Sequence, residues 1–125
     1  MNEDFNPDQP IYLQLAERIS YRITRKELGL GAKLPSVREM AIQASVNPNT
    51  VQRAYSELER KGIVETKRGQ GTFVTKDDFV LTKLRETLKQ EQIVNFVNDM
   101  RNMGYSDEEM INGLEHYFQK GGINK

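Results

Sequence analysis

Residues 36–74 read SVREMAIQASVNPNTVQRAYSELERKGIVETKRGQGTFV, and this stretch decides the fold of the chain. Ser36 is a favourable residue for capping the start of a helix, and Glu39, three residues later, completes a capping box. Asn47 can cap a second helix with Pro48 at its first position, where the missing N–H of proline costs nothing. The stretch therefore predicts two short helices joined by a tight turn.

A β-hairpin is predicted directly after the second helix. Gly62 ends that helix, and two short runs of β-prone residues, 63–66 and 72–75, flank the segment Gly69-Gln70-Gly71. Glycine supplies the positive φ angles that a hairpin tip requires. Residues 67–68 add two cations next to the tip. A helix presented by its N-terminus beside a basic wing suits the major groove of DNA.

The second predicted helix has two different faces when its residues are placed at intervals of about 100°. Its apolar face consists of Val51, Ala54, Tyr55 and Leu58. Its polar face consists of Asn49, Gln52, Arg53 and Ser56, with Thr50 at the edge. Any amphipathic helix has a polar face toward solvent, but residues 47–56 contain no acidic side chain. Amide, hydroxyl and guanidinium groups without carboxylates favour contact with base edges and phosphates.

The segment before this stretch predicts one more helix. Residues 1–9 are polar, and we expect a flexible N-terminus there. Pro10 suits the first turn of a helix, and residues 29–35 form a loop because two glycines and a proline interrupt them. We therefore expect a winged helix-turn-helix domain over residues 10–76. The first helix has one apolar stripe, made of Tyr12, Leu15, Ala16, Ile19 and Ile23.

Residues 77–125 predict a helical tail. Phe79 to Met103 predicts either one long helix or two joined by a kink near residues 89–92. The reason is that the apolar residues before and after that polar stretch point in directions roughly 140° apart. A second capping box, which begins at Ser106, starts the last helix. The fold class we expect is mainly α with a small β-hairpin: a winged domain followed by a two-helix dimerisation segment.

The tail carries more large apolar side chains than two helices of this size can easily bury by themselves. We expect these side chains to form the interface of a homodimer; packing against the winged domain is the alternative. Twofold symmetry would then place two of the polar helix faces on a pseudo-palindromic site. The candidate interface residues are Ile93, Phe96, Val97, Met100, Met103, Met110, Ile111, Leu114, Tyr117 and Phe118.

Composition restricts the function classes. The 125 residues include no cysteine and one histidine, so neither a metal site nor a cofactor is expected, and no pair of catalytic groups suggests an enzyme. No apolar run approaches the ~20 residues of a membrane span, and the polar N-terminus does not resemble a secretory signal; we expect a cytoplasmic protein. Net charge is zero, but residues 1–76 carry 12 basic against 9 acidic residues. This modest asymmetry places the excess cations in the predicted winged domain, where they could contact the phosphates of DNA.

Three runs together resemble a known family. PIYLQLAERI, LPSVREMA and VNPNTVQRAYSELERKGIVETKRGQGTFV are similar to the winged helix-turn-helix of GntR-type bacterial transcription regulators, over roughly residues 9–75. The resemblance implies that Arg38 contacts DNA from the start of a helix; a salt bridge to a helix neighbour is the alternative. It also implies that the next helix and the wing bind DNA. Those residues are Asn47, Asn49, Thr50, Gln52 and Arg53 on the helix, and Arg68, Gly69, Gln70 and Gly71 on the wing, beside which we expect Lys67 to bind phosphate.

The short helical tail resembles the YtrA-like subfamily, whose members dimerise through it. Larger GntR relatives have a ligand-binding or aminotransferase-like domain, for which about 50 residues are too few. The function expected is a sequence-specific DNA-binding transcriptional regulator, a repressor, on a pseudo-palindromic operator. The expected partners are double-stranded DNA, a second copy of the chain and an unidentified small-molecule effector. A winged-helix adaptor that binds proteins is the alternative, which a missing wing would have favoured.

Overall fold

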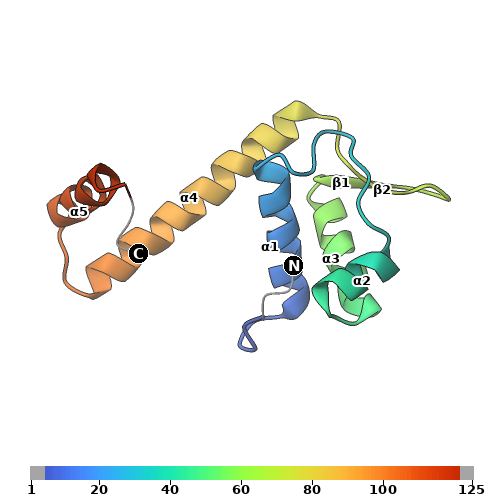
Figure 1. Ribbon diagram of the computed structural model, residues 1–125, viewed down its shortest axis with the longest axis horizontal. Coiled ribbons are helices and arrows are strands. Elements are labelled where there is room, and N and C mark those ends of the chain that lie inside the picture. Colours follow the sequence, from blue (N-terminus) through green and yellow to red (C-terminus); the bar gives the residue numbers. More distant parts are fainter. Residues whose placement is uncertain (1–4, 122–125) are drawn as a thin grey trace. The chain divides into compact units, whose positions relative to one another are not determined.

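The computed structural model describes residues 5–121, which form five helices and two strands (Figure 1). The mainly helical class with one antiparallel hairpin is confirmed. The chain divides into two compact units, Met1–Arg85 and Glu86–Lys125; the expected winged domain over residues 10–76 lies within the first. The elements in chain order are α1 (Ile11–Thr24), α2 (Val37–Ala44), α3 (Pro48–Arg60), β1 (Val64–Lys67), β2 (Gly71–Val74), α4 (Asp78–Asn102) and α5 (Asp107–Gln119).

The core of the first unit lies where α1 and α2 contact α3. The predicted apolar faces form it: all four apolar residues of α3 are buried, as are four of the five residues of the α1 stripe. Tyr12, the fifth, is partly buried at the edge of the core. The largest fully buried side chains are Leu15, Ile19, Leu34, Met40, Leu58, Val51, Val64 and Val74.

Hydrogen bonds from side chains fix the helix-turn-helix, as the sequence predicts. The Ser36 hydroxyl accepts from the backbone N–H of Glu39 at 3.1 Å, and the Glu39 carboxylate accepts from the N–H of Ser36 at 2.8 Å. Ser45 ends α2 in the left-handed conformation, with φ 57°. The side-chain oxygen of Asn47 then accepts from the N–H of Asn49 at 2.7 Å, and Pro48 occupies the first position of α3.

The hairpin pairs Val64 with Val74 and continues to the pair Lys67–Gly71 at the tip. Both strands begin and end about one residue away from the expected runs, because the turn contains only residues 68–70. Residues 32–34, expected to be a loop, add a third extended segment along the free edge of β2. The N–H of Leu34 donates to the carbonyl of Thr72 at 2.8 Å, and the N–H of Val74 donates to that of Ala32 at 2.8 Å. β2 is therefore the central strand of the wing.

Residues 5–9, which belong to the segment expected to be flexible, contact α1. The side chain of Gln14 bonds the backbone of Asn6 in both directions, at 2.8 and 2.6 Å. The guanidinium of Arg18 lies 3.9 Å from the centre of the Phe5 ring. Polar and aromatic groups of α1 thus hold residues 5–9 in place, whereas residues 1–4 lie outside the described part of the chain.

Residues 78–102 form one uninterrupted helix, α4, as the first of the two expected arrangements has it; whether it bends near residues 89–92 stays a prediction. Its two apolar sets have different surroundings. Leu81 and Leu84 pack against the core of the first unit. In the second unit Met110 of α5 is buried, while Phe96 and Phe118 are 37% and 69% exposed. Among the described residues, no helix combines the length and apolarity needed to cross a bilayer.

Candidate nucleic-acid interface

The N-terminal half of α3 presents the predicted polar face to solvent. Asn49, Gln52, Arg53 and Ser56 are exposed, and Thr50 is partly exposed. The acid-free character of this face persists in three dimensions because the acidic residues of α3 lie in its second half, where Arg60 and Lys61 pair with Glu57. The first turn also lies at the positive end of the helix dipole, which favours anions.

Asn47, expected to contact DNA, has a structural role as well. Its side-chain oxygen is occupied by the cap of α3, which orients the turn before the helix. The amide nitrogen of Asn47 is a donor that this cap does not use. Its contact with DNA therefore stays a prediction, restricted to donation from that nitrogen.

Arg53 does not extend freely into solvent. Its guanidinium carbon lies 4.0 Å from the centre of the Tyr12 ring, a cation–π contact between α3 and α1. Tyr12, which the sequence pattern assigned to the core stripe, thus positions an arginine of the polar face. The stripe periodicity alone could not reveal this, because the contact joins residues far apart in the sequence.

We expect Tyr12→Leu to weaken DNA binding through Arg53. Losing the ring removes an interaction of roughly 0.5–1 kcal/mol, an exposed cation–π contact, and leaves the arginine less ordered. The affinity for an operator duplex, measured by fluorescence anisotropy, should fall by the corresponding factor of about two to five. Tyr12→Phe keeps the ring and is the control; a loss of the same size in both variants would contradict the role of the ring.

Arg38, at the start of α2, is exposed and has no ion-pair partner among residues 5–121, so the alternative of a salt bridge to a helix neighbour is not seen there. The adjacent carboxylate of Glu39 is committed to the capping box. Hydrogen bonds from Ser36 lower the pKa of the Glu39 carboxyl, and the positive charge of Lys33 adds to this. The cap therefore leaves the guanidinium of Arg38 available for another anion.

A buried hydrogen bond fixes α3 relative to the segment that leads into α2. The Tyr55 hydroxyl donates to the carbonyl of Pro35 at 2.6 Å. Burial is the main cause that raises the pKa of Tyr55 well above its usual value, so the hydroxyl keeps its proton and remains a donor. This bond ties α3 to the segment that leads to Arg38.

The wing presents Lys67, Arg68, Gly69, Gln70 and Gly71 in and around its turn, as predicted. Gly69 has φ 76° and Gly71 has φ 127°, conformations that residues with a Cβ rarely adopt. The ammonium of Lys67 lies 4.9 Å from the centre of the Phe73 ring. The structure thus assembles Arg38, the polar face of α3 and the wing within one unit, and we call these three parts the candidate DNA-binding surface.

One cation near the wing was missed by the sequence analysis. Lys33 lies in the segment expected to be a loop, and it pairs with Phe73 of β2 in an isolated β-bridge. A three-residue strand is too short for its alternating pattern to be recognised. The only sequence signal is a lysine between small and apolar neighbours, and that pattern is common in loops.

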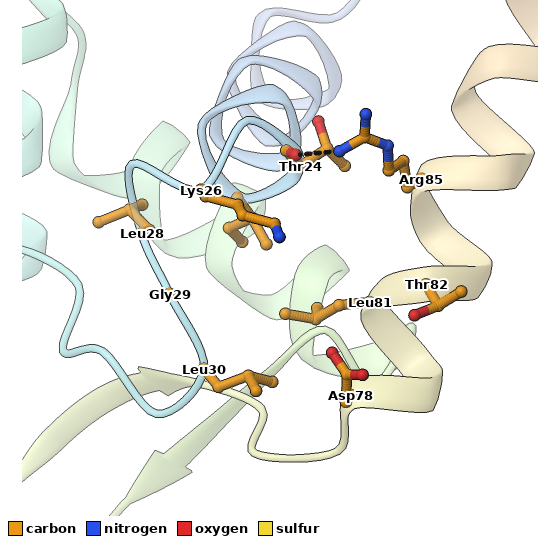
Figure 2. A pocket seen from close by; sticks show the side chains of 10 residues that line it. Thr24, Lys26, Leu28, Gly29, Leu30, Asp78, Leu81, Thr82 and Arg85 are labelled. Carbon is orange, nitrogen blue, oxygen red and sulfur yellow. Dashed lines mark hydrogen bonds between the residues drawn. The ribbon is translucent and has the colours of Figure 1, made fainter.

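A cavity of about 380 Å³ lies beside the first turns of α4 (Figure 2). Its size is in the range of small-molecule sites. Ile23, Leu28 and Leu81 contribute apolar surface, and Lys26 and Arg85 contribute cations. Figure 2 shows Arg85 donating from Nη1 to the carbonyl of Thr24, a bond of 3.2 Å that connects α4 to the end of α1.

Comparison with known proteins identifies the family to which this surface belongs. The family model described as "Bacterial regulatory proteins, gntR family" matches residues 11–74, which include α1 to β2. The chain belongs to the GntR family. The GntR match ends with the wing, so it covers the candidate DNA-binding surface but not the helical tail.

Individual GntR relatives extend the similarity to the tail. YhcF of Bacillus subtilis (strain 168), named an uncharacterized HTH-type transcriptional regulator, is 51% identical over 97% of this chain and 100% of its own length. YtrA of the same organism, named an HTH-type transcriptional repressor, is 38% identical over 81% of this chain and 78% of its own length. The resemblance to YtrA-like regulators is thereby confirmed.

Solved structures agree with these GntR relatives. A GntR family transcriptional regulator from Listeria monocytogenes superposes with a TM-score of 0.84 at 36% identity, over 90% of this chain and 98% of its own. The DNA-binding domain of AraR, solved in complex with operator ORR3, superposes with a TM-score of 0.53 at 29% identity, over 60% of this chain and 88% of its own. The protein is thus a DNA-binding transcriptional regulator of the helix-turn-helix type.

Proposed function

We propose that this GntR-family regulator is a homodimeric repressor that binds a pseudo-palindromic operator. The single observation that carries the proposal is the polar, acid-free first half of α3, which is exposed in the same unit as Arg38 and the wing. In this proposal Asn49, Thr50, Gln52 and Arg53 read base edges, while Arg38 and the wing residues contact the backbone and the minor groove. The relative YtrA is named a transcriptional repressor, which supports repression rather than activation.

Selection of DNA from a random pool tests the proposal directly. The purified protein should enrich a sequence whose two halves are related by a twofold axis, with half-sites about one helical turn or a multiple of it apart. Placed over a promoter, the enriched sequence should reduce reporter expression when the protein is present. Enrichment of a single, non-repeated half-site would contradict the dimeric arrangement, and increased expression would contradict repression.

The homodimer is proposed from the apolar surface of the tail. Ile93, Met103, Ile111, Leu114, Tyr117 and Phe118 are 40–69% exposed, and large apolar patches on soluble proteins mark interaction sites. Ile93 lies on α4 and Met103 directly follows it, while the other four repeat at helical spacing on α5, which suits a symmetric helical interface. A second copy of the chain would cover these side chains and present a second candidate DNA-binding surface.

We expect Leu114→Asp to disrupt the dimer. Twofold symmetry would bury two unpaired carboxylates in one interface, which is strongly unfavourable. Light scattering coupled to size exclusion should give twice the chain mass for the wild type and the chain mass for the variant at the same micromolar concentration. Asn112→Asp introduces the same charge on the opposite side of α5 and should remain dimeric. A monomeric wild type would refute the proposed interface.

The expected small-molecule effector stays a prediction. The cavity beside the start of α4 has a volume and a mixed apolar and charged lining, with Lys26, Arg85 and Asp78, that suit a small ligand. The cavity contacts α4, the helix that leads into the tail. A ligand bound there would be able to change the DNA affinity of the first unit.

A further inference from the structure

The wing has an outer face that carries two lysines, one on each side of its central strand. β1 pairs Lys67 with Gly71 on one edge of β2, and residues 32–34 pair Lys33 with Phe73 on the other. Side chains alternate between the two faces of a sheet. These four residues therefore share the face opposite to Val64 and Val74, which point into the core.

The side chain of Lys33 lies across the backbone of Gly71. A Cβ atom at position 71 would lie 2.8 Å from Cε of Lys33, so the flexible end of the lysine would have to shift. Glycine lets the lysine lie against the backbone there. Lys67 lies directly opposite Gly71 in the ladder, so the two lysines approach the same residue from both edges of β2.

The lysines of this face keep their ammonium groups outside ion pairs in the described part of the chain, although the charge of Lys33 also acts on the capping carboxylate of Glu39. Over residues 5–121, neither Lys33 nor Lys67 forms an ion pair. Glu65 is exposed on the same face but lies opposite Phe73, away from the tip. Lys33 is exposed, and its flexible stem ends in a compact charge that binds phosphate without regard to base sequence.

We propose that Lys33 and Lys67 form a binding site for the DNA sugar-phosphate backbone on the outer face of the wing, with Gly71 as its floor. The site rests on the proposed operator binding for its biological use, but its chemistry requires only duplex DNA. Lys33 then contributes affinity and fixes how the wing lies along the groove, while α3 provides the sequence specificity. The side chain reaches the site because residues 32–34 pair with β2.

The test is the salt dependence of DNA binding by Lys33→Met, which removes the charge and keeps most of the stem. Each phosphate contact contributes about 0.9 to the slope of log affinity against log salt concentration. Fluorescence anisotropy with a generic duplex and with the selected operator should show that slope shallower by about 0.9. Both duplexes should lose affinity by the same factor, so that their ratio is unchanged.

Two further variants make the result specific. Lys33→Arg keeps a cation and should retain the wild-type slope. Lys83→Met removes an exposed lysine of α4 that has no part in the site and should also retain it. Melting temperatures of all variants, measured by circular dichroism, show whether the wing remains folded.

An unchanged slope in Lys33→Met, at an unchanged melting temperature, would overturn the proposal. A shallower slope in Lys83→Met as well would do the same, because it would assign the effect to net charge. Failure of the proposed function is distinguishable: a wild type that enriches no palindrome but binds generic duplex with a Lys33-dependent slope refutes the operator and supports the backbone site.

Discussion

Replacing Ile19 by alanine lowers the free energy of unfolding by about 2–5 kcal/mol, the range for truncating a fully buried aliphatic side chain. Ile19 has no exposed surface and lies on the face of α1 that contacts α3. The variant loses the transfer energy of the removed carbons and leaves a cavity that the helices only partly fill. Urea denaturation followed by circular dichroism, at one fixed protein concentration, measures the difference.

Ile42→Ala is the matched control. It makes the same chemical change on α2, where the isoleucine side chain is 74% exposed. Surface substitutions of this kind change stability by about 0.5 kcal/mol or less. Equal losses of unfolding free energy in the two variants would mean that the side chain of Ile19 is not buried in the core.

Replacing Asn49 by alanine costs about 1–3 kcal/mol of binding to the selected operator, the value of one good contact to a base edge. The cap of α3 uses the backbone N–H of Asn49 and not its side chain, so the fold should be unchanged. Binding to generic duplex should also be unchanged, because the amide reads a base and neutralises no phosphate. The ratio of the two affinities, measured by anisotropy, therefore isolates the specific contact.

Asn98→Ala, an exposed asparagine of α4 turned away from the proposed dimer face, is the control and should bind like the wild type. Wild-type affinity of Asn49→Ala for the operator would show that the exposed face of α3 does not read bases. A loss shared equally by operator and generic duplex would instead assign Asn49 to the backbone.

Local chemistry made much of the DNA-binding unit predictable. Both capping boxes and the Asn47-Pro48 helix start depend on residues within three positions of one another, so they can be recognised from the sequence. The two faces of α3 follow from helical spacing alone, and the hairpin tip follows from its glycines. The continuity of α4 did not follow, because its change of apolar direction fits both a straight helix with two partners and a broken one.

The amino-acid sequence by itself determined the helix-turn-helix, its wing and the acid-free polar face of α3, since each depends on spacing over a few residues. Only the tertiary structure decided that Tyr12 holds Arg53, that Lys33 crosses Gly71 and that residues 5–9 are tied to α1. These contacts join segments separated by turns whose path no local pattern specifies.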